Sequence, residues 1–264
     1  MTTTIGGMNR NSFKAGLLAR KKQIGFWLTA DSLTVTEYAA NVGFDWLLLD
    51  MEHTTLDFGR VEQHILAAKG GCAELVVRVP CIDSAIVKRL LDCGARSLMF
   101  PFVQSADEAR LAAVSTLYPP RGIRGYSGSH RRNGYGDSAK DYLATYADEQ
   151  CVIVQVESPT GVAAIPEISK IEGVDSIFVG PNDLSFNMGM NGDMSAPVVK
   201  EKIREALGLI QKGGKAAGIL NFDREEARAL LKMGFDHVAV HGDSAVLGAG
   251  ALDYATAFDG RENW

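Results

Sequence analysis

Charged and polar side chains stand inside or directly after apolar segments of this 264-residue chain. The residues in such positions are Asp50, Glu52, His53, Arg78, Gln155, Glu157, Asn182, Asp183 and His241. Charged side chains prefer water, so their place among apolar neighbours indicates a functional site.

Two of these residues, Glu157 and Asp183, follow consecutive apolar segments. If those segments are neighbouring strands, both carboxylates point into the same mouth and could hold a divalent cation. Ligation by oxygen alone suits Mg²⁺, Mn²⁺ or Co²⁺. The alternative is that each carboxylate caps the helix that follows it.

Arg78 and His53 are candidate catalytic residues. The guanidinium of Arg78, in Val-Val-Arg-Val-Pro, needs an anion, which could be a substrate carboxylate or an enolate oxygen. A structural ion pair with Asp50 is the alternative. His53 follows Asp50 and Glu52, and a histidine oriented by a carboxylate is typical of a general base. The alternative is that His53 caps a helix or lies on the surface. The role of His241 is left open.

Two absences narrow the chemistry. No lysine stands at the carboxyl end of an apolar segment, which disfavours a Schiff-base mechanism. Neither GxGxxG nor GxxxxGK[ST] occurs between a predicted strand and helix, so we expect no nucleotide cofactor. A metal-dependent enolate mechanism is therefore favoured.

The elements that must position these residues are short, continuously apolar segments, each followed by a helical pattern. Continuous apolarity indicates strands buried on both faces of a parallel sheet. The predicted strands are Ile24–Leu28, Trp46–Asp50, Leu75–Val79, Ser97–Pro101, Val152–Glu157, Ser176–Gly180, Ala216–Leu220 and His237–His241. Eight such units predict a single (β/α)8 TIM-barrel domain over residues 1–264, with an open doubly wound sheet as the alternative.

One segment does not fit the regular alternation of strands and helices. Residues 119–150 separate the fourth predicted helix from the fifth predicted strand by much more than an ordinary loop. The segment is rich in arginine and glycine, including Arg124, Arg131 and Arg132. We expect a mobile lid or substrate loop that attracts anions; solvated surface decoration is the alternative.

Composition excludes several classes of protein. A net charge of −5, a pI near 5.6 and 46% hydrophobic residues indicate an ordinary globular chain rather than a nucleic-acid-binding or disordered one. No signal-like or membrane-spanning stretch is evident, so we expect a cytoplasmic protein without a membrane partner. The four cysteines form no CxxC pair, and we expect buried free thiols.

Five blocks of sequence together resemble the metal-dependent HpcH/HpaI aldolase family. The resemblance runs from about Ile24 to Leu252 and rests on FDWLLLDMEH, VVRVP, MFPFVQSADEAR with YPPRGIRG, VQVES and FVGPNDLS. It implies a (β/α)8 barrel whose last helix is exchanged between subunits, in a hexamer built as a trimer of dimers. Met51 departs from the pattern, which often has Gly before the Glu-His pair.

The resemblance also implies roles for individual residues. Glu157 and Asp183 match the ligands of Mg²⁺, Mn²⁺ or Co²⁺, and Arg78 matches the arginine that binds the pyruvyl oxygen. His53 with Asp50 matches the pair that moves protons through a bound water.

Further matches concern substrate binding. Gln155 lines the pyruvate site, and the backbone amides around Asn182 and Asp183 receive the pyruvate carboxylate. Asp92 matches an acidic residue that reaches a neighbouring subunit's site. Outside these matches, Arg131 or Arg132 in the insertion could bind a distal carboxylate or other anionic group of the substrate.

The implied activity is reversible cleavage of a 2-keto-4-hydroxy (2-keto-3-deoxy) acid into pyruvate and an aldehyde, as in the catabolism of aromatic or sugar acids. A related lyase acting on an acyl-CoA ester, or an oxaloacetate decarboxylase, is the alternative within enzymes. A non-catalytic barrel that binds a metal ion and a keto acid is the alternative outside them.

Overall fold

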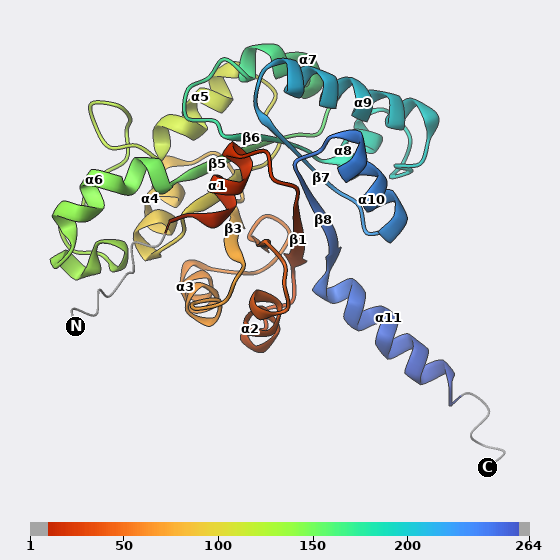
Figure 1. Ribbon diagram of the computed structural model, residues 1–264, viewed down its shortest axis with the longest axis horizontal. Coiled ribbons are helices and arrows are strands. Elements are labelled where there is room, and N and C mark those ends of the chain that lie inside the picture. Colours follow the sequence, from red (N-terminus) through yellow and green to blue (C-terminus); the bar gives the residue numbers. More distant parts are fainter. Residues whose placement is uncertain (1–9, 259–264) are drawn as a thin grey trace.

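The computed structural model describes residues 10–258, which form a closed barrel of eight parallel strands in sequential order with helices around it (Figure 1). The predicted (β/α)8 TIM barrel is confirmed. The strands are β1 Gln23–Leu28, β2 Trp46–Asp50, β3 Glu74–Arg78, β4 Ser97–Phe100, β5 Cys151–Val156, β6 Ser176–Val179, β7 Ala216–Leu220 and β8 His237–Gly242. Residues 1–9 and 259–264 of the expected domain lie outside the described part.

Helices connect the strands, and most begin at a polar cap. Ser32, Asp57, Asp83, Ser105, Ser158 and Asp223 each accept a hydrogen bond from a backbone N–H in the first turn of the helix that follows. The helices are α1 Ser12–Leu18, α2 Leu33–Asn41, α3 Phe58–Ala67, α4 Ser84–Cys93, α5 Ala106–Ser115, the 3-10 helix η1 Arg131–Gly136, α6 Ala139–Glu149, α7 Pro159–Ile168, α8 Pro181–Asn187, α9 Pro197–Lys212, α10 Arg224–Met233 and α11 Asp243–Thr256.

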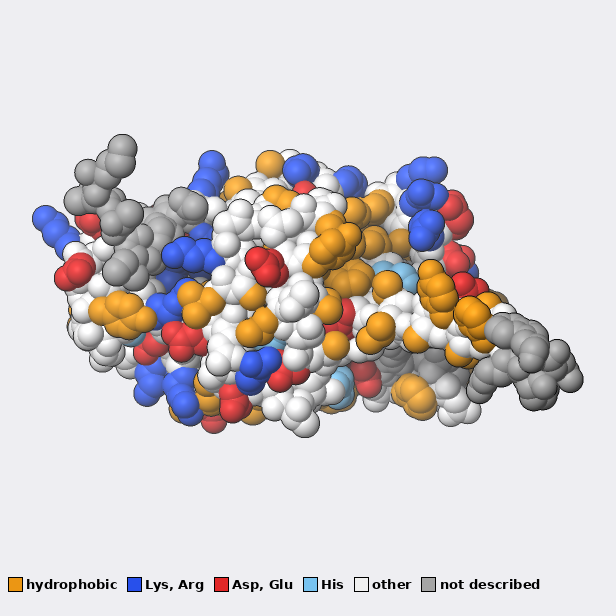
Figure 2. Space-filling model, turned by 90° about the horizontal axis from the view of Figure 1, so that it is seen from below, with side chains coloured by type: hydrophobic (Ala, Val, Ile, Leu, Met, Phe, Trp, Pro, Cys, Tyr) orange, Lys and Arg blue, Asp and Glu red, His pale blue; other side chains and the backbone are white. Residues whose placement is uncertain are grey.

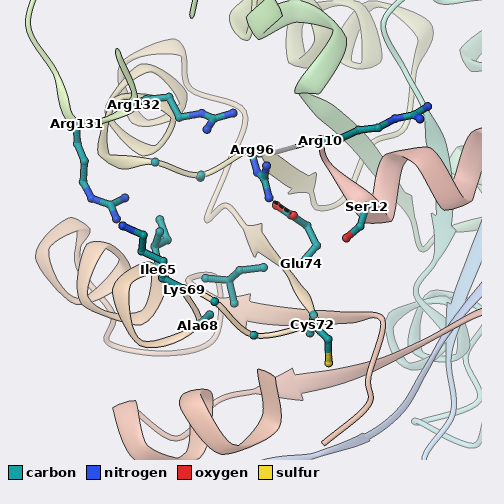
Figure 3. Close-up of a pocket in the computed structure, with 16 residues that line it drawn as sticks. Arg10, Ser12, Ile65, Ala68, Lys69, Cys72, Glu74, Arg96, Arg131 and Arg132 are labelled. Carbon is teal, nitrogen blue, oxygen red and sulfur yellow. Dashed lines mark hydrogen bonds and ion pairs between the residues drawn. The ribbon is translucent and has the colours of Figure 1, made fainter. Parts of the chain in front are cut away.

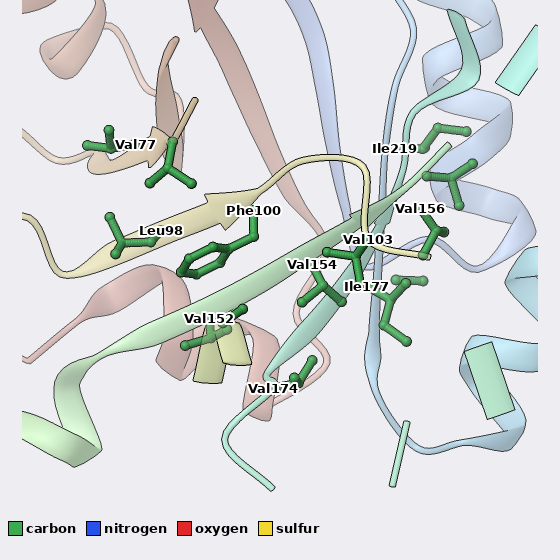
Figure 4. Packing of buried hydrophobic residues seen from close by; sticks show 14 of the residues in the cluster. Val77, Leu98, Phe100, Val103, Val152, Val154, Val156, Val174, Ile177 and Ile219 are labelled. Carbon is green, nitrogen blue, oxygen red and sulfur yellow. The ribbon is translucent and has the colours of Figure 1, made fainter. Parts of the chain in front are cut away.

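Alternation along the strands divides the apolar core in two. Residues such as Leu47, Val77 and Leu98 face outward and pack under the helices, as the side chains in Figure 4 do. Their sequence neighbours Leu48 and Val76 face inward and fill the barrel with aromatic and aliphatic groups. Because successive side chains point to opposite faces of a strand, this alternation decides which polar residues enter the interior.

Helix α1, which the sequence analysis did not predict, closes the amino-terminal end of the barrel. Its Phe13 is fully buried, with its ring 5.4 Å from that of Trp46 and 5.2 Å from that of His237. A β-carbon at Gly25 would overlap the Trp46 indole, so the strand beside it requires glycine. Burial lowers the pKa of His237 to about 3, and the ring is therefore a neutral part of this plug.

The segment 119–150 does not cover the carboxyl-terminal mouth of its own barrel. Its η1 and α6 pack on each other, and η1 packs on α4. Arg124 is fully buried, donating to Asp92 over 2.6 Å and to the Tyr142 hydroxyl over 2.8 Å. The buried Arg124 thus finds its partners on the flank of the barrel, and a role of the segment as a lid or substrate loop stays a prediction.

The surface shows two further features. Helix α11 extends away from the barrel (Figure 1), and residues such as Leu247 and Tyr254 are 69% and 75% exposed. All four cysteines are free as expected, but Cys72 and Cys81 are exposed rather than buried. Within residues 10–258, no helix is both long and apolar enough to cross a membrane.

The plug at the amino-terminal end generates a stability prediction. Replacing Phe13 by alanine removes a fully buried aromatic ring, and we expect the free energy of unfolding to fall by about 3–5 kcal/mol. Leu18→Ala, one turn away and 69% exposed, should change it by about 0.5 kcal/mol or less. Denaturant titrations of both variants test this; equal losses would show that α1 does not close the barrel.

Candidate active site

A chamber of about 490 Å³ opens at the carboxyl-terminal ends of the strands. Alternation along β2, β3 and β5 sends Asp50, Arg78 and Gln155 to the same interior face as Leu48 and Val76. The walls of the chamber are Trp27, Thr29, His53, Arg78, Gln155, Gly180, Pro181, Asn182, Asp183, Met194, Leu220 and Phe222. Six of the predicted strand ends, those of the first, second, third, fifth, sixth and seventh strands, thus contribute to one cavity.

Arg78 lies at the centre of a buried charged cluster. It pairs in register with Asp50 across β2 and β3, and its Nε and Nη2 reach the Asp50 carboxylate over 3.0 and 2.5 Å. Its Nη1 is 3.0 Å from a Glu52 oxygen, and the guanidinium lies 4.9 Å from the centre of the Trp27 ring. The structural ion pair between Arg78 and Asp50 is therefore present, and Arg78 also faces the chamber.

The two carboxylates beside Arg78 titrate in opposite directions. Burial alone would raise the pKa of Asp50, but the hydrogen bonds and charge of Arg78 outweigh it and hold that pKa below its usual value. The pKa of Glu52 is raised, because burial and the negative charges of Asp50 and Asp183 together exceed the attraction of Arg78. The charge of Arg78 thus outweighs the effect of burial on Asp50 but not on Glu52.

Glu157 brings a further buried carboxylate to this end of the barrel. It is 3% exposed, and it accepts hydrogen bonds from the backbone N–H of Phe102 over 2.7 Å and from Gln155 Nε2 over 2.5 Å. A β-carbon at Gly180 would overlap its carboxylate, so glycine there makes the approach possible. Burial, with the nearby charges of Asp183 and Glu52, raises the pKa of Glu157 to about 7.

Neither Glu157 nor Asp183 caps a helix, so that alternative interpretation was wrong. The N-cap of α7 is Ser158, whose hydroxyl accepts from the Gly161 N–H, and α8 begins at Gly180 with no side-chain cap. Asp183 lies in the first turn of α8 and lines the chamber beside Asn182. Neither carboxylate is therefore occupied by a helix cap.

Asp50 and His53 do not form the side-chain pair expected from the sequence. The Asp50 carboxylate is taken up by Arg78 and Trp27, and it meets only the backbone N–H of His53, at 3.4 Å. The imidazole is 64% exposed in the chamber wall, with its Nε2 3.7 Å from Glu52. Asp50 positions the loop that carries His53, while Glu52 is the carboxylate nearest its ring.

Two predicted substrate-binding residues lie away from this chamber. Asp92, on α4, accepts from Arg124 and has its side chain 22% exposed on the flank of the barrel. Arg131 donates to the Cys93 carbonyl over 2.8 Å and lines a cavity at the other end of the barrel. Arg131 therefore does not reach a substrate in its own chain's chamber, because the insertion folds against the flank.

The sequence analysis missed the apolar side of the chamber. Trp27, Met194, Leu220 and Phe222 line it, and Phe222 stacks on His241 with ring centres 5.2 Å apart. Apolar residues at strand ends give no signal that separates chamber walls from core. Phe222 lies two residues after the end of β7, and this position after a strand was the one available signal.

The donor set fits a hard divalent cation. Asp183 adds negative charge near the buried Glu157, and the buried Gln155 Oε1 has no hydrogen-bond partner among the described residues. Within residues 10–258, no group of three or more His, Cys, Asp or Glu side chains is placed to hold a metal ion by itself. The protein thus offers two carboxylates to such an ion, and oxygen ligands of this kind suit Mg²⁺ and Mn²⁺.

A closed (β/α)8 barrel with ionisable groups gathered at the carboxyl ends of its strands is the architecture of a barrel enzyme. The chain belongs to the HpcH/HpaI aldolase/citrate lyase family, which matches residues 23–248. The family predicted from the sequence is confirmed, and with it the expectation of a carbon–carbon lyase of the aldolase type.

Similar proteins cover nearly the whole chain. Proteins named 5-keto-4-deoxy-D-glucarate aldolase from Klebsiella pneumoniae and Escherichia coli K12 are 41% and 42% identical over 248 residues, 94% of this chain and 96% of each of theirs. A crystal structure of a family member from Burkholderia cenocepacia superimposes with a TM-score of 0.90 at 36% identity, covering 94% of this chain and 98% of the other.

The buried Asp50–Arg78 pair can be tested by stability. Asp50→Asn leaves the Arg78 guanidinium without its full counter-charge, and we expect the free energy of unfolding to fall by about 3 kcal/mol. Asp107→Asn removes the same charge from a 97% exposed side chain and should cost less than about 1 kcal/mol. Denaturant titration at pH 7 checks both; a loss no larger than that of the control would contradict the central role of the pair.

Proposed function

We propose that this protein is a divalent-metal-dependent aldolase that reversibly cleaves a 2-keto-3-deoxy-4-hydroxy sugar acid into pyruvate and an aldehyde. The observation that carries the proposal is a chamber lined by Arg78, Gln155 and Asp183, with the buried carboxylate of Glu157 hydrogen-bonded to the Gln155 side chain. The substrate class is supported by the aldolases named above, which match this chain over almost its full length.

Glu157 and Asp183 would hold the cation, either Mg²⁺, Mn²⁺ or Co²⁺. When bound, such an ion acts as a Lewis acid toward the keto acid and favours the enolate that cleavage forms. Glu157 must lose its proton to bind a cation, and its pKa of about 7 makes this coupling strong.

The keto-acid end of the substrate lies between Arg78 and the β6–α8 turn. Backbone amides at Asn182 and Asp183 receive the carboxylate, and the amide side chain of Gln155 lines the same site. Arg78, already fixed by Asp50, presents its remaining N–H groups to the oxygen that gains negative charge. A donor held in advance costs no reorganisation during the reaction, which is why such groups stabilise transition states.

His53 supplies the proton transfer. In cleavage it removes the proton of the C4 hydroxyl, through water, and the electrons of the O–H bond form the aldehyde C=O. The C3–C4 bond breaks, and its electrons pass into the enolate, which is then protonated at C3 to give pyruvate. The exposure of the imidazole in the chamber wall and the nearby Glu52 suit a group that must exchange protons with solvent.

The aldehyde fragment occupies the apolar side of the chamber, against Leu220, Met194 and Phe222. The exposed apolar residues of α11, seen near the C-terminal end in Figure 2, support packing of this helix on another copy of the chain. A hexamer built as a trimer of dimers would place Asp92 against a neighbouring subunit's chamber. Measurement of the molecular mass in solution tests this assembly.

The direct test follows the methyl protons of pyruvate by NMR in D₂O. We expect exchange that depends on Mg²⁺ or Mn²⁺, is absent from metal-stripped protein and is abolished by Glu157→Gln. Because Glu157 titrates near pH 7, cation affinity should weaken about tenfold per pH unit below pH 6 and level off above pH 8.

Glu167→Gln is the matched control, since this carboxylate lies exposed on α7 and pairs only with Lys170 in the described part of the chain. It should leave exchange unchanged. Exchange that persists in Glu157→Gln with unaltered cation affinity would reject the ligand assignment, and no exchange under any cation would favour the acyl-CoA lyase alternative.

His53→Ala should slow carbon–carbon cleavage by about 10²–10⁴-fold, the usual contribution of a general acid–base group. Added imidazole should restore part of the rate, which a purely structural loss would not allow. The measurement is kcat against pH for wild type and variant with a 2-keto-4-hydroxy acid. An unaltered pH–rate profile would exclude His53 as the base.

A further inference from the structure

A second cavity, of about 450 Å³, lies at the opposite end of the barrel from the chamber. Its floor is formed by the residues that lead into β3 and β4, and its walls come from the end of α3, from the segment just before α1 and from η1 (Figure 3). None of the residues proposed for catalysis lines it. The cavity is therefore a separate site, built largely where the insertion meets the barrel.

Positive charge dominates this cavity. Its ionisable lining residues, apart from Cys72, are Arg10, Lys69, Glu74, Arg96, Arg131 and Arg132. Glu74 is the single carboxylate of this set, and it is already engaged by Arg96, whose Nε donates to it over 2.9 Å. The cavity thus gathers several cations around one carboxylate that has a partner of its own.

No carboxylate contacts Arg132 directly. Within residues 10–258 its side chain forms no salt bridge and no hydrogen bond, and the guanidinium lies 5.9 Å from the centre of the Tyr142 ring. Burial and the nearby charge of Arg96 lower the pKa of Arg132 to about 10, although Glu74 and Glu149 attract it from a distance. A bound anion would offset the cost of burying this guanidinium beside a second one.

Arg131 fixes the geometry of this wall. Its Nη1 donates to the Cys93 carbonyl over 2.8 Å, and its Nε is 3.7 Å from Glu62, so it ties the start of η1 to the end of α4. Its neighbour Arg132 is thereby held at the rim of the cavity. The arginine-rich segment, predicted to attract anions, places Arg131 and Arg132 at the amino-terminal end of the barrel and not at the mouth.

We propose that this cavity, here called the basal pocket, binds a small polyanion of the phosphate or carboxylate type, with Arg132 as its principal contact. Guanidinium groups bind both chemistries through paired N–H donors, and Lys69 adds a mobile point charge at the opposite wall. The cavity volume suits a compact ligand of several charges. This site is independent of the proposed aldolase chemistry.

The test is calorimetric titration of the full-length, metal-free protein with pyrophosphate and, in a second arm, with citrate, at fixed pH and 150 mM salt. We expect saturable binding of at least one of them. Arg132→Gln should weaken it at least tenfold, and Lys69→Gln severalfold. Lys140→Gln is the matched control, since it removes one positive charge from an exposed position of the same insertion outside the basal pocket.

The outcomes separate this site from the catalytic chamber. Retained far-UV circular dichroism and unchanged pyruvate exchange in Arg132→Gln would show that the variant folds and that the loss is local. The ligand that binds more tightly shows whether the basal pocket prefers phosphate or carboxylate groups. Binding of neither ligand, or binding that Arg132→Gln and Lys69→Gln leave unchanged, would overturn the proposal whether or not the aldolase assignment holds.

Discussion

The bidentate contact between Arg78 and Asp50 governs the carboxyl-terminal end of this barrel. Both side chains are almost fully buried, so neither could remain charged there without the other. The parallel register between β2 and β3 places them directly opposite one another. The Trp27 indole and the backbone of the His53 loop then bind the same carboxylate, so one ion pair sets the positions of three neighbouring elements.

The same pair determines the charge that the chamber presents. Arg78 satisfies Asp50 and lies against Glu52, which leaves Glu157 and Asp183 without a cation among the described residues. Burial, with the nearby negative charges of Asp183 and Glu52, raises the pKa of Glu157 to about 7. The divalent cation that we propose between Glu157 and Asp183 would offset this negative charge, which Arg78 does not reach because Asp50 and Glu52 already engage it.

The sequence predicted the barrel because each strand is a continuous apolar run, and it predicted the chamber residues because they interrupt those runs. The predictions that failed assumed that residues close in the sequence also lie and point close together in the structure. Asp50 and His53 are three residues apart, yet the pleat turns Asp50 into the barrel while His53 lies in the loop beyond it. Arg131 lies in a segment whose direction depends on long-range contacts with Cys93 and Glu62, which no local pattern contains.

Strand β3 links the two ends of the barrel. Glu74 and Arg78 stand at its two ends on the same interior face, with the apolar Val76 between them. Each end is fixed by an ion pair to an adjacent element, Glu74 to Arg96 before β4 and Arg78 to Asp50 on β2. The aromatic plug around Phe13 and Trp46 separates the two polar regions. Because apolar packing fills the interior between them, this short strand joins the two polar regions most directly, with a charged side chain of the basal pocket at its first residue and one of the chamber at its last.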